Sequence, residues 1–214
     1  MNLKEIPLRL KGNSEPIYGD FGYRFAALLL DIVITLPVSL VVLYFNSKAL
    51  YNFYFTFPCS IIFALWYYIY LPKNFGATPG KRIVGLQLLK INGDDISYKD
   101  AFLRYLPYFI NTIISVCCMV FCIRLADSNE YANLEWQEQS RYLTSFLPIG
   151  IIIQGIYSTV LVITDFTIYI TSQRNQSLKD MVAGTVVVFK HMVPDIKAEM
   201  LTVTKIHNVT TPTE

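Results

Sequence analysis

The feature that most constrains this chain is the apolar run at residues 21–45, which reads FGYRFAALLLDIVITLPVSLVVLYF. A helix needs roughly 20 apolar residues to cross the hydrocarbon core of a bilayer, and this run is long enough. It also carries Arg24 at its start and Asp31 in its interior. These positions are about two helical turns apart, so they lie on one helix face. A charge at the bilayer centre costs about 2.5–3.5 kcal/mol on insertion scales, so an acid there indicates a function or an internal partner.

Three further apolar runs have similar lengths, and they predict spans at about residues 50–71, 100–123 and 145–170. The 214 residues are 53% hydrophobic and only 16% charged, whereas about a quarter of the residues in globular domains are charged. We therefore predict an all-α membrane protein with four transmembrane helices. Residues 1–20 form an N-terminal lead without the apolar core of a signal peptide, residues 21–190 the transmembrane domain, and residues 191–214 a polar tail, expected to be disordered after Pro194.

The basic residues predict the orientation. Fifteen of the 18 Lys and Arg residues fall in the two terminal segments, in the segment between the second and third spans and in the adjoining span ends. The other three lie in the two remaining loops: Lys48, Arg124 and Arg141. Because cytoplasmic loops carry an excess of basic residues, both termini are expected in the cytosol. The loop at residues 124–144 is expected outside, with an amphipathic helix around Leu134, Trp136 and Tyr142.

Two apolar runs are too short to cross a bilayer, at residues 84–91 and 185–189. The first precedes the turn dipeptide Asn92-Gly93, and the second is rich in β-branched residues. We predict that they pair as a small two-stranded β element on the cytosolic side. Pro72 is expected to end the second span, and Thr78 to cap a helix that begins at Pro79.

Two sequences resemble capping boxes, in which a serine and an acid three residues later bond each other's free backbone amides at a helix start. One opens the third span at Ser97 and Asp100, and the other joins Ser177 to Asp180. Asp180 therefore has a structural explanation as a cap. The alternative is that it bridges to Arg24 or Lys81 and closes the bundle on its inner side.

Several classes of function are disfavoured. The net charge of +2, without a basic cluster among aromatics, argues against nucleic acid as a partner. The four cysteines lie within predicted spans at spacings unlike a zinc site, which favours packing roles. Neither histidine lies in the predicted bundle, and no nucleophile-base pair or nucleotide motif is present, so we expect no enzyme activity, cofactor or metal.

The ionisable groups of the predicted spans each have two interpretations. Asp31 is either a carboxylate that handles a proton or a small cation, or a helix-packing residue with hydroxyl or basic partners. Arg24 either snorkels and pairs structurally, or holds an anionic group. Asp165, near the inner end of the fourth span, either faces Asp31 and shares a proton or cation with it, or is solvated. Arg104 is expected to snorkel.

The mid-span amides and one basic pair are also candidates. Asn111 and Gln154 either join helices by hydrogen bonds or line a pathway. Lys81 and Arg82 either anchor the chain at the membrane interface or contact lipid phosphates.

Three motifs occur in order along the chain. They are RFAALLLD at residues 24–31, GATPGKRIVGL at residues 76–86 and LKDMVAGTVVV at residues 178–188. Together they resemble the RDD family of small bacterial membrane proteins, named for one arginine and two aspartates. By resemblance these residues are Arg24, Asp31 and Asp180. The resemblance implies a multi-pass protein of the bacterial inner membrane, and transport or cation/proton exchange as its function.

Two hypotheses follow. In the first, the protein is a transporter or cation/proton exchanger of unknown substrate that uses Asp31, with Asp165 and Asn111 as partners and Arg24 as a counter-charge. In the second, it is a non-transporting assembly or partner-binding subunit whose charged residues lock the fold. The expected partners are the lipid bilayer, a small cation or proton, and further copies of the chain, because four spans rarely enclose a pathway alone.

Overall fold

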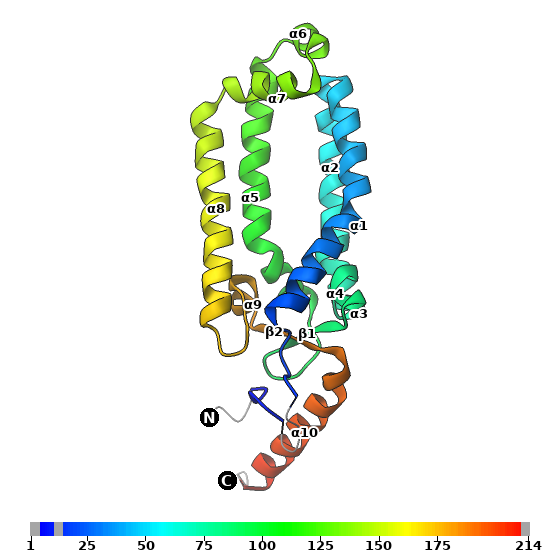
Figure 1. Ribbon diagram of the computed structural model, residues 1–214, viewed down its shortest axis with the longest axis vertical. Helices are drawn as coiled ribbons and strands as arrows, with labels where there is room; N and C mark the ends of the chain where they lie inside the picture. The colour runs from blue at the N-terminus through cyan, green and yellow to red at the C-terminus, as the bar shows by residue number, and fades with distance from the viewer. Residues whose placement is uncertain (1–4, 11–14, 211–214) are drawn as a thin grey trace.

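The fold consists of two long antiparallel helix pairs that stand on a small sheet. The computed structural model describes residues 5–10 and 15–210, with side chains as far as residue 202. Four segments of it are long and apolar enough to cross a membrane, as predicted: α1 (Phe21–Lys48), Leu50–Ile83, α5 (Tyr98–Leu125) and α8 (Pro148–Thr171). Figure 1 shows α1 beside the second segment and α5 beside α8.

The second segment is not one uniform helix. It comprises a 3₁₀ turn η1 (Leu50–Asn52), α2 (Phe53–Leu65), a π-helical turn η2 (Trp66–Tyr70), α3 (Leu71–Phe75) and α4 (Pro79–Ile83). The prediction that Pro72 ends this span is wrong, because Pro72 lies in the first turn of α3, where a missing N–H is tolerated. Helix α3 ends at Gly76, whose φ of 78° places it in the left-handed conformation that glycine adopts without strain, and the segment continues through α4 to Ile83.

A two-stranded antiparallel sheet lies at one end of the helix pairs, which we call the sheet end. Strand β1 (Leu86–Lys90) pairs with β2 (Thr185–Phe189), so that Leu86 lies opposite Phe189 and Lys90 opposite Thr185. This confirms the predicted pairing of two segments almost 100 residues apart. A short helix α9 (Leu178–Val182) precedes β2, and a 3₁₀ turn η3 (Lys190–Met192) follows it.

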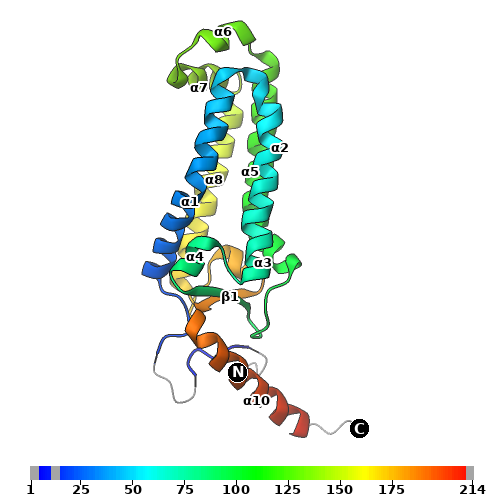
Figure 2. The ribbon, with the colours of Figure 1, turned by 90° about the vertical axis from the view of Figure 1, so that its right-hand side faces the viewer.

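The main hydrophobic core surrounds this sheet and includes both terminal regions. From the lead, Ile6 and Ile17 are fully buried, and Tyr18 forms a bridge with Val188 of β2. The prediction of a disordered tail is wrong for the described residues, which form α10 (Val193–Thr210). The helix is anchored because Ile196 packs into the same core. The chain thus enters and leaves its described part at the sheet end (Figures 1 and 2).

The opposite end, which we call the loop end, is covered by α6 (Ser128–Asn133) and α7 (Trp136–Ser145). Helix α7 is amphipathic, as expected of this loop, and buries Leu143 while Trp136 stays exposed. Buried Gln139 donates hydrogen bonds to three backbone carbonyls, two of them in α6 and its C-cap and one at Ser47, near the end of α1. α8 begins at Pro148 rather than at residue 145, because Ser145 is the last residue of α7.

The distribution of basic residues predicts that the sheet end faces the cytosol. Green fluorescent protein fused after residue 214 is therefore expected to fluoresce. Alkaline phosphatase fused after residue 134, at the loop end, is expected to be active, because it folds only in an oxidising compartment. The reverse pattern would contradict this orientation.

Candidate functional site

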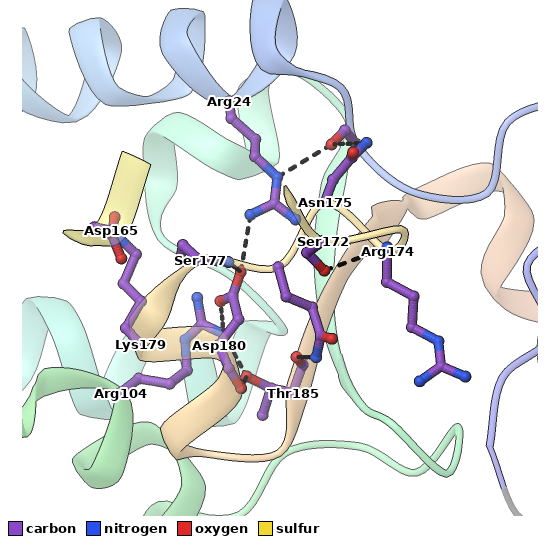
Figure 3. A network of polar contacts seen from close by, with 12 residues as sticks. Arg24, Arg104, Asp165, Ser172, Arg174, Asn175, Ser177, Lys179, Asp180 and Thr185 are labelled. Carbon is purple, nitrogen blue, oxygen red and sulfur yellow. Dashed lines mark hydrogen bonds and ion pairs between the residues drawn. The ribbon is translucent and has the colours of Figure 1, made fainter. Parts of the chain in front are cut away.

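Asp180, in the short helix α9, lies at the centre of a charge network at the sheet end (Figure 3). Its side chain is fully buried. Oδ2 accepts hydrogen bonds from Arg24 Nη1 at 2.8 Å and from the backbone N–H of Ser177 at 3.1 Å, and Oδ1 pairs with Nη1 of Arg104. Asp180 therefore both caps α9 and bridges to α1, so the two roles weighed for it from the sequence occur together.

Electrostatics stabilise the charged form of this acid. Burial alone would raise the pKa of the Asp180 carboxyl, but Arg104, Arg24 and Lys179 outweigh that effect and hold its pKa well below the usual range. The two arginines have further partners. Arg24 donates from Nε to the carbonyl of Gly19 and lies over a tyrosine ring, and Arg104 donates to the hydroxyl of Thr185 in β2.

Arg104 was missed as a network residue by the sequence reasoning, which left it to snorkel. The sequence did contain a signal for this role: Arg104 lies near the start of α5, as Arg24 lies near the start of α1. Two buried arginines at the same end of a bundle need an acid between them. Which acid that is depends on how the chain folds back through α9.

Asp31 occupies a second polar site, between α1 and α4. It is 7% exposed, and its partners are neutral. Oδ1 accepts from the hydroxyl of Tyr67 at 2.5 Å and the N–H of Gly80 at 2.8 Å, and Oδ2 accepts from the hydroxyl of Thr78 at 2.7 Å. The prediction that a helix begins at Pro79 with Thr78 as its N-cap residue is confirmed, but the Thr78 hydroxyl makes no capping hydrogen bond and donates to Asp31 instead.

Tyr67 is buried, and its hydroxyl donates a hydrogen bond to Asp31. It belongs to the π-helical turn η2, a geometry that is rare and frequent at functional sites. The next residue, Tyr68, stacks on Tyr105 of α5 with ring centroids 5.5 Å apart. The π turn thus directs one tyrosine to Asp31 and the next to the other helix pair.

The other candidates from the sequence lie apart from Asp31. Asp165 pairs with Lys179 at 3.2 Å, so in the described part of the chain the two acids do not share a contact. Asn111 accepts from the hydroxyl of Ser158 at 3.0 Å and joins α5 to α8. Gln154 lines a cavity of about 340 Å³ that is bounded by α2, α5, α7 and α8.

Lys179 illustrates how the network balances its charges. Burial would lower the pKa of this lysine, but attraction by Tyr108, Asp165 and Asp180 exceeds that effect and raises the pKa.

Within the described residues, no group of three or more His, Cys, Asp or Glu side chains is arranged to hold a metal ion.

The basic pair after Pro79 separates into two environments. Arg82 is exposed and lies 5.0 Å from the ring centroid of Phe75. Lys81 is half-buried, and it takes part in none of the ion pairs that the described residues form.

These features define a helical membrane protein with a buried arginine–aspartate network beside the sheet and a separate carboxylate in the first candidate span. The chain belongs to the RDD family, whose sequence model matches residues 18–184. Arg24, Asp31 and Asp180 all fall within the match and all occupy the two polar sites. Comparisons with curated proteins and with solved structures found no match.

Gly80→Ala is expected to destabilise the protein by about 1–3 kcal/mol, the usual cost of overpacking. A Cβ at this position would meet the carbonyl oxygen of Ala27 and lie 2.6 Å from Asp31 Oδ1. Thermal unfolding in detergent measures the effect. The matched control is Gly155→Ala in α8, where a Cβ meets nothing within 4 Å and stability should stay equal or rise. Equal unfolding temperatures for the two variants would contradict a tight contact between α1 and α4.

Asp180→Asn is expected to cost about 3–5 kcal/mol at pH 7, because it leaves two buried guanidiniums without their anion. The folded pKa of Asp180 is depressed, so its contribution is complete above the unfolded pKa of about 3.9 and is lost as the pH falls below it. The stability difference between wild type and variant should therefore shrink below about pH 4.

The measurement is unfolding temperature against pH for both proteins. Asp95→Asn serves as the control, since its pair with Lys197 is exposed and such pairs contribute about 0–1 kcal/mol. A difference for Asp180→Asn that stayed constant down to pH 3 would contradict the buried ion pairs.

Proposed function

We propose that this protein moves a small cation or protons across the bacterial inner membrane, with Asp31 as the ion-handling group and the sheet end in the cytosol. The observation that carries the proposal is the nature of Asp31's partners. Among the described residues it is the buried carboxylate without a cation in contact, whereas Asp180 has two. A buried charge without a counter-ion is costly, and intramembrane acids of this kind are functional by default.

The geometry suits a group that changes its charge. Oδ1 is fixed by Tyr67 and Gly80, so the side chain keeps its position whichever form it takes. Oδ2 has one hydroxyl donor, Thr78, and a carboxylate oxygen has room for two. A proton or a small cation can therefore occupy the second position on Oδ2 without breaking the contacts of Oδ1. The two ligands compete because both need the same lone pair, which is the basis for exchange.

The pathway is proposed to lie in an assembly of several copies. In each of the four candidate spans, at most 11% of the apolar window is buried within the chain. The described helices therefore leave most of their apolar surface to lipid or to neighbouring copies. This distribution favours an oligomer in which Asp31 is reached along the boundary of the chain.

A second candidate is a non-transporting assembly or partner-binding subunit whose charges lock the fold. It is favoured by the three hydrogen bonds that already satisfy Asp31 and join α1 to η2 and α4. In this case Asp31 needs no exchangeable ligand. The charge network around Asp180 and the three hydrogen bonds to Asp31 would then serve only to hold the helices at a fixed spacing.

Proton flux into proteoliposomes, followed with a pH-sensitive dye after addition of Na⁺ or K⁺, tests the proposal. Wild-type protein should give cation-dependent proton flux. Asp31→Asn should reduce this flux at least about tenfold, because an amide side chain does not take up and release protons near neutral pH. The control is Asp95→Asn, whose exposed pair with Lys197 lies beyond the sheet and should leave the flux unchanged.

Flux that survives Asp31→Asn would reject the role of Asp31. If wild-type protein gives no flux with either ion, and Asp31→Asn abolishes accumulation in the membrane, the assembly subunit becomes the better description.

A further inference from the structure

A cavity of about 340 Å³ lies toward the loop end and is lined by residues from both helix pairs. Its walls come from α2, α5, α7 and α8, so three of the four belong to candidate spans. Two of the lining residues, Cys122 and Leu143, are buried in the hydrophobic core of the loop end. Packing therefore holds that side of the cavity in place. Its volume lies in the range of small-molecule sites, about 300–1,000 Å³.

Two polar side chains in this cavity lack a partner from the chain. Toward the sheet end, the Ser158 hydroxyl of α8 donates to Asn111 Oδ1 of α5 at 3.0 Å. One helical turn nearer the loop end, the corresponding positions are Ser115 on α5 and Gln154 on α8. Both line the cavity, and neither side chain forms a hydrogen bond within the described part of the chain.

The two helices approach each other on either side of this level. Nearer the loop end, a Cβ added at Gly150 of α8 would lie 3.3 Å from Cys118 Sγ of α5, which is a close contact. Nearer the sheet end, the hydrogen bond between Asn111 and Ser158 joins them. The unpaired amide and hydroxyl therefore lie between two contacts that fix the positions of their helices.

We infer that the cavity binds an uncharged amphipathic molecule from the membrane, whose polar group bonds Gln154 and Ser115. None of the ten lining residues is charged, so an ionic ligand would enter without a counter-ion, at a high cost. Seven of the ten are apolar or contain sulfur, which suits an apolar body. A purely apolar ligand would leave the amide and the hydroxyl unpaired, which is also unfavourable.

The chemistry of the two polar groups defines the head of the ligand. A glutamine amide and a serine hydroxyl each offer both a donor and an acceptor, so a hydroxyl group can bond to either of them. Because the walls are mostly spans, such a molecule can reach the cavity from the bilayer. This inference does not depend on transport at Asp31.

The experiment measures the unfolding temperature of the purified full-length protein in neutral detergent, titrated with decanol or with decane as a mole fraction of the micelle. Decanol should reach half of its stabilising effect on wild type at a mole fraction about fivefold lower than on Gln154→Leu, since one hydrogen bond is worth about that factor. Decane should affect both proteins equally. Thr159→Val is the matched control, because this exposed hydroxyl of α8 lies outside the cavity and bonds its own helix at Gly155. It should respond as wild type does.

Equal stabilisation of wild type by decanol and by decane would overturn the inference and would identify a space that acyl chains fill. A Gln154→Leu variant that responds to decanol as wild type does would also overturn it.

Two neighbouring thiols provide a second measurement if Gln154→Leu shifts the unfolding temperature by itself. Cys118 lines the cavity, whereas Cys117 is exposed and does not line it. Decanol should slow the modification of Cys118 by N-ethylmaleimide and leave that of Cys117 unchanged, as measured by mass spectrometry on Cys117→Ala and Cys118→Ala variants. Decane at the same mole fraction should protect Cys118 less. Equal protection of both thiols by decanol would contradict binding in the cavity.

Discussion

The structure depends on one fully buried carboxylate that two arginines share. Asp180 joins α1 through Arg24 and α5 through Arg104, and its own helix precedes β2. Segments from the start, the middle and the end of the chain therefore meet at a single side chain. Such an arrangement is favourable only when all its members are in place, because each isolated charge would be left in a medium of low dielectric. The network therefore favours one arrangement of the two helix pairs over any other.

Asp31 is stabilised by a different means. Its partners are two hydroxyls and one backbone N–H, which stabilise a negative charge but do not neutralise it. The close approach of α4 to α1 depends on Gly80, since any larger residue would meet the α1 backbone. Asp180 is thus paired with two cationic side chains, whereas Asp31 is held in place by neutral donors alone. This difference separates a residue that fixes the fold from one that is suited to chemistry.

Local patterns in the sequence were enough to predict much of this fold. Hydrophobic length gave the four spans, and the capping boxes and the Asn92-Gly93 turn placed the short elements around the sheet. The errors arose where a distant contact decides a local conformation. α10 is helical in its described part because Ile196 packs into a core formed by β1, β2 and the lead. Of these, β1 and the lead are far from Ile196 in the sequence. Hydroxyl partners were one of the predicted possibilities for Asp31, but the residues that supply them were missed for the same reason, since the π turn that directs Tyr67 toward Asp31 has no signal in the sequence pattern.

The middle of each helix pair has little to hold it within the chain, so the two ends determine the architecture. At the sheet end the Asp180 network joins the pairs, and at the loop end Gln139 ties α7 to the end of α1. Between these ends the spans expose most of their apolar residues. Lipid tails are as apolar as such side chains, so exposure there costs nothing in a bilayer. Polar contacts at the ends can therefore fix the spacing of the pairs while their faces remain available to lipid or to another copy, and the buried charges are what make such an open bundle stable.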